Sequence, residues 1–233
     1  MPAHTDVWGQ TEVAERSFVS QVFGWMCFAL VITGLVAFAT ANSATLANAI
    51  LGNKIVFYGL LIGQLLLVLG LTALINKISA AVATAVFILY AAVNGLTLSV
   101  IFFAFTEGSL AGTFFITAGT FGVMCLIGYT TRRDLTGIGG ICSMALIGLI
   151  IASIVNLFWS NSALYWITTY AGVLIFVGLT AYDMQKIKNY SAGAAQAAEG
   201  EVPKGAILGA LALYLDFINL FLFFLRIFGR RRR

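Results

Sequence analysis

Charged residues are scarce in this sequence. Only 9% of its 233 residues are Asp, Glu, Lys or Arg, whereas a soluble domain carries roughly 25%. Because 61% of the residues are hydrophobic, the chain has too little polar surface to cover a water-soluble globule. The same apolar bulk excludes a disordered or fibrous protein. The composition therefore predicts an integral membrane protein with very little soluble domain attached.

Motifs for catalysis and cofactor binding are also missing. The 3 cysteines stand in separate apolar runs without a CxxC motif, so we interpret them as packing residues rather than metal ligands. The sequence contains no phosphate-binding loop, no GxSxG and no cluster of metal ligands. A chain this apolar is a poor candidate for binding nucleic acid. We therefore expect no cofactor and no enzymatic activity.

Long apolar runs are abundant, and a spanning helix needs about 20 such residues. There are seven runs of this kind, at Val22–Ala41, Ile55–Ile75, Ala80–Phe105, Leu110–Thr130, Gly139–Phe158, Ala163–Met184 and Ala206–Phe228. They predict an all-α membrane bundle of seven transmembrane helices, with a polar N-terminal arm (1–21), a membrane domain (22–228) and a basic C-terminal tail (229–233). The longest connection, Asn189–Lys204, is rich in small residues and is expected to be a mobile polar loop.

Lysine and arginine in the short loops predict the orientation. The N-terminal arm and the second, fourth and sixth loops hold seven of them, against Lys54 alone in the other loops. This bias places the N-terminus inside. Five arginines, Arg226 and Arg230 to Arg233, then fall outside, unless the last segment dips into the membrane and returns. Because no Gly or Pro offers a turn between Ala210 and Phe228, seven complete spans are expected.

Two aspartates interrupt the last two apolar segments, where a charge costs roughly 2.5–3.5 kcal/mol at the bilayer centre. Asp216 lies near the middle of the last segment, and Asp183 lies in the last turns of the one before. Two carboxyl groups that meet in a low dielectric medium cannot both ionise cheaply, so they would share a proton or bind a cation such as calcium. Their different depths make such contact depend on helix tilt or staggered ends.

Other roles for the polar residues of these segments stay open. Asp216 could pair with a Lys or Arg of another helix, and Asp183 could be solvated or paired with Lys186. Asn219, on the same helix face as Asp216, and Asn94 in the third segment are candidates to line a pathway. Hydrogen bonding between helices is the competing role for both asparagines, and we favour it.

From the third segment onward, the sequence resembles the Bax inhibitor family, also called transmembrane Bax inhibitor motif proteins, and in its short loops the bacterial branch. The resemblance is carried by LYAAVNGLTLS (89–99), TFFITAGTFG (113–122), GYTTRRDLTGIG (128–139), GLTAYDMQKIK (178–188) and LALYLDFINLFLFFLR (211–226). It implies a seven-helix fold with the last helix central, in a bacterial inner membrane. It also implies a pH-sensitive calcium leak channel in which Asp183 and Asp216 are the pH sensor and hold calcium transiently.

Two alternatives to a calcium leak remain. Members of the family are also associated with cell-death suppression and, in bacteria, with modulating a membrane protease. The chain could therefore be a non-conducting regulator that binds a membrane protease through residues 189–204 and its tail. An intramembrane aspartyl protease is suggested by Tyr182-Asp183, but Leu213-Tyr214-Leu215 replaces the Gly-x-Gly that should precede its second aspartate. The expected partners are calcium ions, the lipid bilayer and, for the regulator, that protease, with no nucleic acid.

Overall fold

The structure is a computed structural model that describes residues 4–194 and 204–232. Its helices are α1 (His4–Asn42), α2 (Ala44–Leu51), α3 (Lys54–Leu74), α4 (Ala80–Leu98), α5 (Val100–Ala104), α6 (Glu107–Thr130), α7 (Thr136–Trp159), α8 (Ser162–Ala194) and α9 (Lys204–Phe228). Within the described residues, seven helical segments are long and apolar enough to cross a membrane, with α4 and α5 together forming the third. The prediction of an all-α membrane protein with seven spans is confirmed.

Two helices extend well beyond the apolar segments that predicted them. α1 begins at His4, so the polar arm is helical from that residue and continues directly into the first span. α8 continues to Ala194, ten residues past Met184, where its apolar run ends. Polar helix formers such as Gln185 and Lys186 sustain the helix there without adding hydropathy. The expected loop Asn189–Lys204 is thus helical at its start, and residues 195–203 lie outside the described part of the chain.

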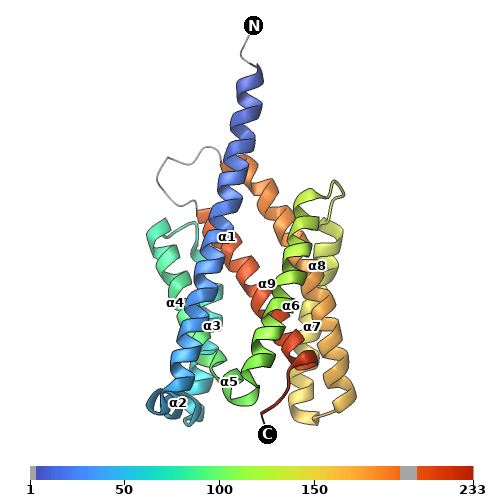
Figure 1. Ribbon diagram of the computed structural model, residues 1–233. Coiled ribbons are helices and arrows are strands. Elements are labelled where there is room, and N and C mark those ends of the chain that lie inside the picture. Colours follow the sequence, from blue (N-terminus) through green and yellow to red (C-terminus); the bar gives the residue numbers. More distant parts are fainter. Residues whose placement is uncertain (1–3, 195–203, 233) are drawn as a thin grey trace. The chain divides into compact units, whose positions relative to one another are not determined.

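Backbone contacts divide the chain into two compact units, and α9 contributes to both. Of the described residues, the first unit holds 4–105, 190–194, 204–214 and 232, and the second holds 106–189 and 215–231. In the first unit α1 packs along α4, and α4 also packs on α3 (Figure 1). A Cβ at Gly95 of α4 would lie 2.7 Å from the carbonyl oxygen of Thr33. The missing side chain therefore permits the close approach of α1 and α4.

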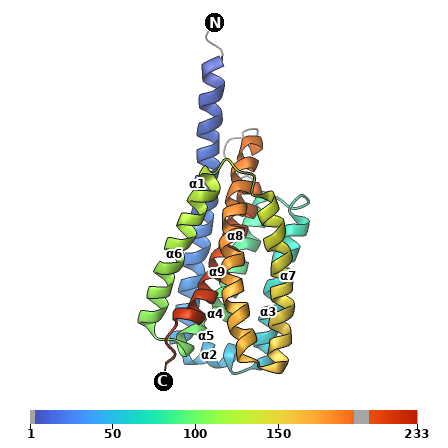
Figure 2. The ribbon, with the colours of Figure 1, turned by 90° about the vertical axis from the view of Figure 1, so that its right-hand side faces the viewer.

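The second unit contains α6, α7, α8 and the later part of α9, and α7 runs beside α8 (Figure 2). Asp134 lies in the short loop between α6 and α7. Its carboxylate accepts hydrogen bonds from the backbone N–H of Thr136 at 2.9 Å and from its hydroxyl at 2.6 Å. These bonds stabilise the charged form and hold the pKa of Asp134 below its usual value. They also cap the first turn of α7, so the loop has a defined conformation.

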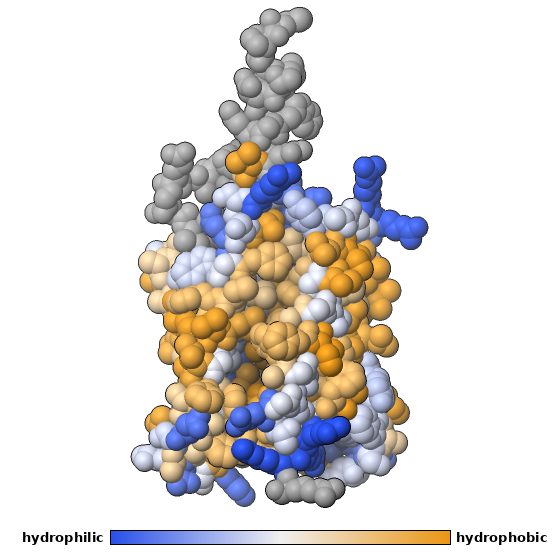
Figure 3. All heavy atoms as spheres, in the orientation of Figure 1, coloured by the Kyte–Doolittle hydropathy of each residue, from blue (hydrophilic) through white to orange (hydrophobic). Residues whose placement is uncertain are grey.

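Large apolar side chains are exposed along the helices in both units. Leu66, Ile147 and Leu174 are 62%, 61% and 72% exposed. Figure 3 shows such residues in orange along the middle of the helices, with hydrophilic residues nearer the helix ends. Lipid tails cover surfaces of this kind in a membrane. α9 differs from the other spans: 72% of its most apolar stretch is buried, against 6% for α3, a burial that fits the enclosed position expected of the last helix.

The last segment crosses as one uninterrupted helix rather than dipping and returning. In the second unit, the backbone N–H of Thr106 donates to the carbonyl oxygen of Arg230 at 3.1 Å, which places the start of α6 beside the end of α9. The guanidinium of Arg226 lies 5.6 Å from the ring of Tyr165, near the start of α8. The basic tail is therefore at the end of the second unit opposite the loop of Arg132 and Arg133, as seven complete spans require.

Candidate functional site

Asp183 and Asp216 come together in the second unit. Asp183 is eleven residues before the end of α8 at Ala194, and Asp216 is twelve residues after the start of α9 at Lys204. The two aspartates are therefore at nearly the same depth when counted from the helix ends that the connection 195–203 joins. The apolar segments suggested different depths because the polar last part of α8 was not counted as helix. Because α8 extends beyond its apolar segment, the ends of the apolar segments are staggered, and this stagger allows the two acids to meet.

The carboxyl groups of Asp183 and Asp216 lie close enough to each other to share a hydrogen bond. Two carboxylates have no hydrogen to donate, so such a bond requires one proton in the pair. The Asp216 side chain is only 4% exposed, and Asp183 is half-buried. The Oδ2 atom of Asp216 has no hydrogen-bond partner among the described residues. The pair thus places two carboxyl groups and one oxygen without a partner in a region from which water is largely excluded.

Lys186 and Cys125 are charged or titratable neighbours of this pair. Lys186, one helical turn after Asp183 in α8, attracts the Asp183 carboxylate. Cys125 of α6 lies within electrostatic range of Asp216. Asp216 is therefore paired with a second carboxyl group rather than with the Lys or Arg that one interpretation of the sequence proposed. A pair of this kind responds to protons or cations, whereas a salt bridge would be neutral already.

Two glycines position the part of α8 that carries Asp183. A Cβ at Gly128 of α6 would collide with the carbonyl oxygen of Ala181, and a Cβ at Gly139 of α7 would collide with the ring of Tyr182. These are the two residues that precede Asp183. Lipid supplies no hydrophobic driving force between helices, so such close packing is a main source of their association. The glycines of the GYTTRRDLTGIG stretch therefore determine where α8 lies against α6 and α7.

Gln185 fastens the loop between α6 and α7 to α8, two residues after Asp183. Its side-chain amide donates to the carbonyl oxygen of Arg133 at 2.8 Å, and its oxygen accepts from the N–H of Leu135 at 2.8 Å. Lys188 donates to the carbonyl oxygen of Tyr129 at 2.9 Å, near the C-terminus of α6. A cation is favourable at that end of a helix. The composition of the loop gave no signal of these contacts.

The two asparagines have different surroundings. Asn219 is half-buried, one turn after Asp216, and its amide donates to the carbonyl oxygen of Leu215 in its own helix at 2.8 Å. Asn94 belongs to the first unit, is buried, and donates to the hydroxyl of Tyr214 at 2.8 Å. Asn94 thus makes the interhelical hydrogen bond that is common for membrane asparagines. A pathway-lining role for either residue stays a prediction.

Tyr214 is a buried polar residue that sequence reasoning missed. Its hydroxyl lies 2.8 Å from the Asn94 amide and 2.7 Å from the hydroxyl of Thr33, which in turn donates to the carbonyl oxygen of Ala91 at 2.9 Å. Each group in this chain therefore donates to the next: Asn94 to Tyr214, Tyr214 to Thr33, and Thr33 to Ala91. The Tyr214 and Thr33 hydroxyl groups thus each have a donor and an acceptor as partners. Its position in the motif LYLDF could have indicated a role for Tyr214, but the family resemblance assigns a role only to the aspartate of that motif.

Comparison with known proteins places these residues in a family. The family model described as Inhibitor of apoptosis-promoting Bax1 matches residues 15–233. The inner membrane protein YbhL of Escherichia coli is 51% identical over 223 residues, which cover 96% of this chain and 95% of that protein. A protein of Borreliella burgdorferi is 44% identical, over 96% of each chain. A membrane protein of Streptococcus pyogenes is 34% identical, over 96% of this chain and 97% of its own.

These matches extend over all seven spanning helices and over both aspartates of the pair. Seven apolar spans, together with an inner membrane relative at 51% identity, make this chain an integral protein of the bacterial inner membrane. The match over residues 15–233 shows that the chain belongs to the Bax inhibitor family.

Proposed function

We propose that this chain is a pH-sensitive calcium leak of the inner membrane, without enzymatic activity, in which Asp183 and Asp216 sense protons and cations. The observation that carries the proposal is the close approach of the two carboxyl groups within the membrane-spanning helices of the second unit. Burying two acids against each other costs stability, and such sites are often functional for that reason.

The shared proton is proposed to hold α8 against α9. When that proton leaves, two carboxylates face each other, and two like charges about 4 Å apart repel by about 4 kcal/mol at an effective dielectric constant of about 20. Separation of the helices relieves this repulsion, and so does a cation that takes the place of the proton. Rising pH therefore favours the state in which the pair is open to a cation.

Calcium suits such a pair as a transient occupant. It takes six to eight oxygen ligands, which include carboxylates, carbonyl groups and water. Asp183 and Asp216 provide two carboxyl groups. The described residues contain no cluster of three or more His, Cys, Asp or Glu side chains that could hold a metal ion. Asn219, one turn after Asp216, is proposed as a further lining residue of the pair, because an amide oxygen is also a calcium ligand. A lining role for Asn94 is proposed for the first unit. A site with few charged ligands binds calcium weakly. Weak binding suits a channel, because an ion that passes through must also leave the site.

Calcium influx into liposomes with a trapped calcium dye tests the proposal. Influx through the full-length protein should rise as the pH rises, because deprotonation opens the pair. Asp216→Asn and Asp183→Asn should remove this pH dependence. An amide is a neutral isostere of the protonated carboxyl group and donates the same hydrogen bond at every pH, so influx should stay near its low-pH value.

Asp134→Asn is the matched control, since it makes the same chemical change at an exposed loop carboxylate outside the pair. This variant should keep the pH profile of the wild type. Unchanged profiles in both pair variants, with the proteins shown to be folded, would remove the aspartates from the mechanism. No flux above that of empty liposomes would instead favour the alternative function, a non-conducting regulator that binds a membrane protease or another partner.

A further inference from the structure

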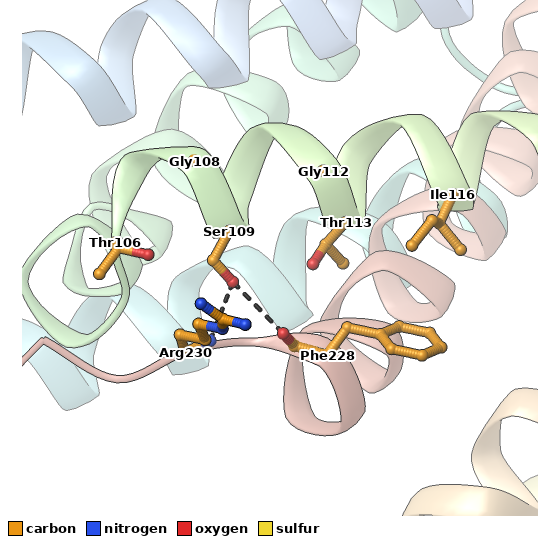
Figure 4. A pocket seen from close by; sticks show the side chains of 8 residues that line it. All are labelled: Thr106, Gly108, Ser109, Gly112, Thr113, Ile116, Phe228 and Arg230. Carbon is orange, nitrogen blue, oxygen red and sulfur yellow. Dashed lines mark hydrogen bonds between the residues drawn. The ribbon is translucent and has the colours of Figure 1, made fainter.

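A second site lies in the second unit, away from the acidic pair. A cavity of about 350 Å³ is present where α6 begins and α9 ends (Figure 4). Its α6 lining ends at Ile116, whereas Cys125, the α6 residue near Asp216, is nine residues further on, or about 14 Å along the helix axis. The cavity is at the end of the unit opposite the loop of Arg132 and Arg133, so it lies near a membrane–water interface.

The side chains that α6 contributes to this cavity change from polar to apolar along the helix. Ser109, Thr113 and Ile116 follow each other at helical spacing, and Figure 4 shows their side chains on the side of α6 that faces Phe228 and Arg230. Gly112 leaves space between them, because a Cβ added there would meet nothing within 4 Å. Hydroxyl groups thus line the part of the cavity near the start of α6, and the apolar side chains of Ile116 and Phe228 line the part further along that helix.

Thr113 carries an unsatisfied polar atom into the cavity. Its side chain is 1% exposed, and its Oγ1 atom has no hydrogen-bond partner among the described residues. Most threonines in these helices donate to a carbonyl oxygen one turn earlier, as Thr117 does to Thr113 at 2.8 Å. A buried hydroxyl without a partner is unfavourable. Its place in the lining of a cavity points to a ligand that supplies the missing hydrogen bond.

Arg230 is held at the mouth of the same cavity. Its backbone N–H donates to the Ser109 hydroxyl at 2.9 Å, and its carbonyl oxygen accepts from the N–H of Thr106 at 3.1 Å. The backbone is therefore fixed, while the exposed guanidinium extends beside the cavity. Thr106 makes no side-chain cap on the first turn of α6. A guanidinium next to an uncapped helix N-terminus is a favourable setting for a phosphate.

We propose that this cavity binds an anionic phospholipid. The phosphate lies at Arg230 and the start of α6, and the Thr113 hydroxyl donates to an ester carbonyl of the lipid. The first part of an acyl chain packs against Gly112, Ile116 and Phe228. A charged head joined to an apolar tail matches the gradient along α6, and the cavity opens at the depth where lipid phosphates lie. Inorganic phosphate shares the head contacts but has nothing to fill the apolar part.

Native mass spectrometry of the full-length protein with added phosphatidylglycerol tests this site, with phosphatidylcholine as the neutral comparison. Arg230→Gln should weaken phosphatidylglycerol binding about tenfold, the effect of losing one charge-assisted hydrogen bond. Gly112→Leu should reduce it similarly by filling the cavity. Arg132→Gln and Gly119→Leu are matched controls, because the first is an exposed arginine at the other end of the unit and the second lies outside the cavity on α6. Both should bind the lipid like the wild type.

Thr113→Val separates a ligand contact from a structural role. It should weaken phosphatidylglycerol binding and, in the delipidated protein, raise the melting temperature, because it removes the unpaired buried hydroxyl without changing the side-chain volume much. A lower melting temperature with unchanged lipid binding would contradict the proposed contact. Equal loss of lipid in the control variants would overturn the site. Displacement of the lipid by excess inorganic phosphate would make the cavity a free-anion site and overturn the lipid assignment. None of these results depends on calcium flux.

Discussion

Tyr214 and Asp216 stand two residues apart in the last helix and remain buried by different means. The Tyr214 hydroxyl is fully enclosed and has partners on both sides, in Asn94 and Thr33. Asp216 lies against the carboxyl group of Asp183, and its Oδ2 atom has no hydrogen-bond partner among the described residues. A satisfied polar group stabilises a fold, whereas an unsatisfied one calls for a functional explanation. At the residue scale this difference separates a structural side chain from a candidate sensor.

Tyr214→Phe should lower the free energy of unfolding by about 1 kcal/mol, since interhelical hydrogen bonds in membrane proteins average about 0.6 kcal/mol and this change removes two. The buried ring is retained, so no cavity is created. Thermal or denaturant unfolding in detergent measures the effect. Tyr58→Phe is the control, because Tyr58 is 60% exposed in the same unit. A loss of several kcal/mol, or no difference from the control, would contradict this account of the network.

At the scale of helices, glycine positions decide which elements approach closely. Gly128 and Gly139 meet backbone or ring atoms of α8, while Gly122 and Gly140 on the same two helices have nothing within 4 Å of an added Cβ. The sequence shows 24 glycines and does not reveal which of them lie at a helix contact. Only the contacts of α8 distinguish them. The pair Gly128 and Gly139 thereby links the packing of three helices to the position of Asp183.

Gly128→Ala should destabilise the protein by about 1–3 kcal/mol, because the added methyl group forces α8 away from α6. Gly139→Ala should also destabilise the protein, since the added methyl group would collide with the base of the Tyr182 ring. Both changes should also alter the pH profile of calcium influx, because Asp183 follows directly. Gly122→Ala and Gly140→Ala should be neutral or slightly stabilising, as expected for helical positions with open space. Unfolding in detergent and the liposome assay provide the two measurements. Equal effects in all four variants would contradict the proposed role of Gly128 and Gly139 in positioning α8.

For the molecule as a whole, the arginines of the tail and the basic residues of the short loops predict opposite orientations in the membrane. Seven complete spans put the tail opposite the loop of Arg132 and Arg133, and the contacts of Thr106 and Ser109 with Arg230 place it there in the second unit. The charges of the short loops predict that the N-terminus is inside, and with seven spans this orientation puts the tail outside. The proposed lipid site gives one of these basic residues a role on that side, because Arg230 would bind a phosphate at the interface.

Cysteine labelling tests this topology. With Cys27, Cys125 and Cys142 replaced by Ala, Arg231→Cys should react with a membrane-impermeant maleimide in intact spheroplasts. Arg132→Cys should react only after the membrane is permeabilised, because the loop is on the inside. The two patterns should be mutually exclusive, and labelling of both positions from the same side would contradict seven complete spans.

The amino-acid sequence was sufficient to predict the membrane class, the seven spans, the family resemblance and the two intramembrane aspartates. These properties depend on local composition and motifs, and the cost of an uncovered charge or backbone group in lipid applies to each segment separately. The folded structure was needed to show that Asp183 meets Asp216, because hydropathy predicted that the helix ends at Met184, whereas α8 continues to Ala194. It likewise showed the partners of Tyr214, the contacts of Gly128 and Gly139, and the cavity at Arg230. Each of these joins residues far apart in the sequence, and in lipid such contacts are selected by shape and hydrogen bonding, which hydropathy does not record.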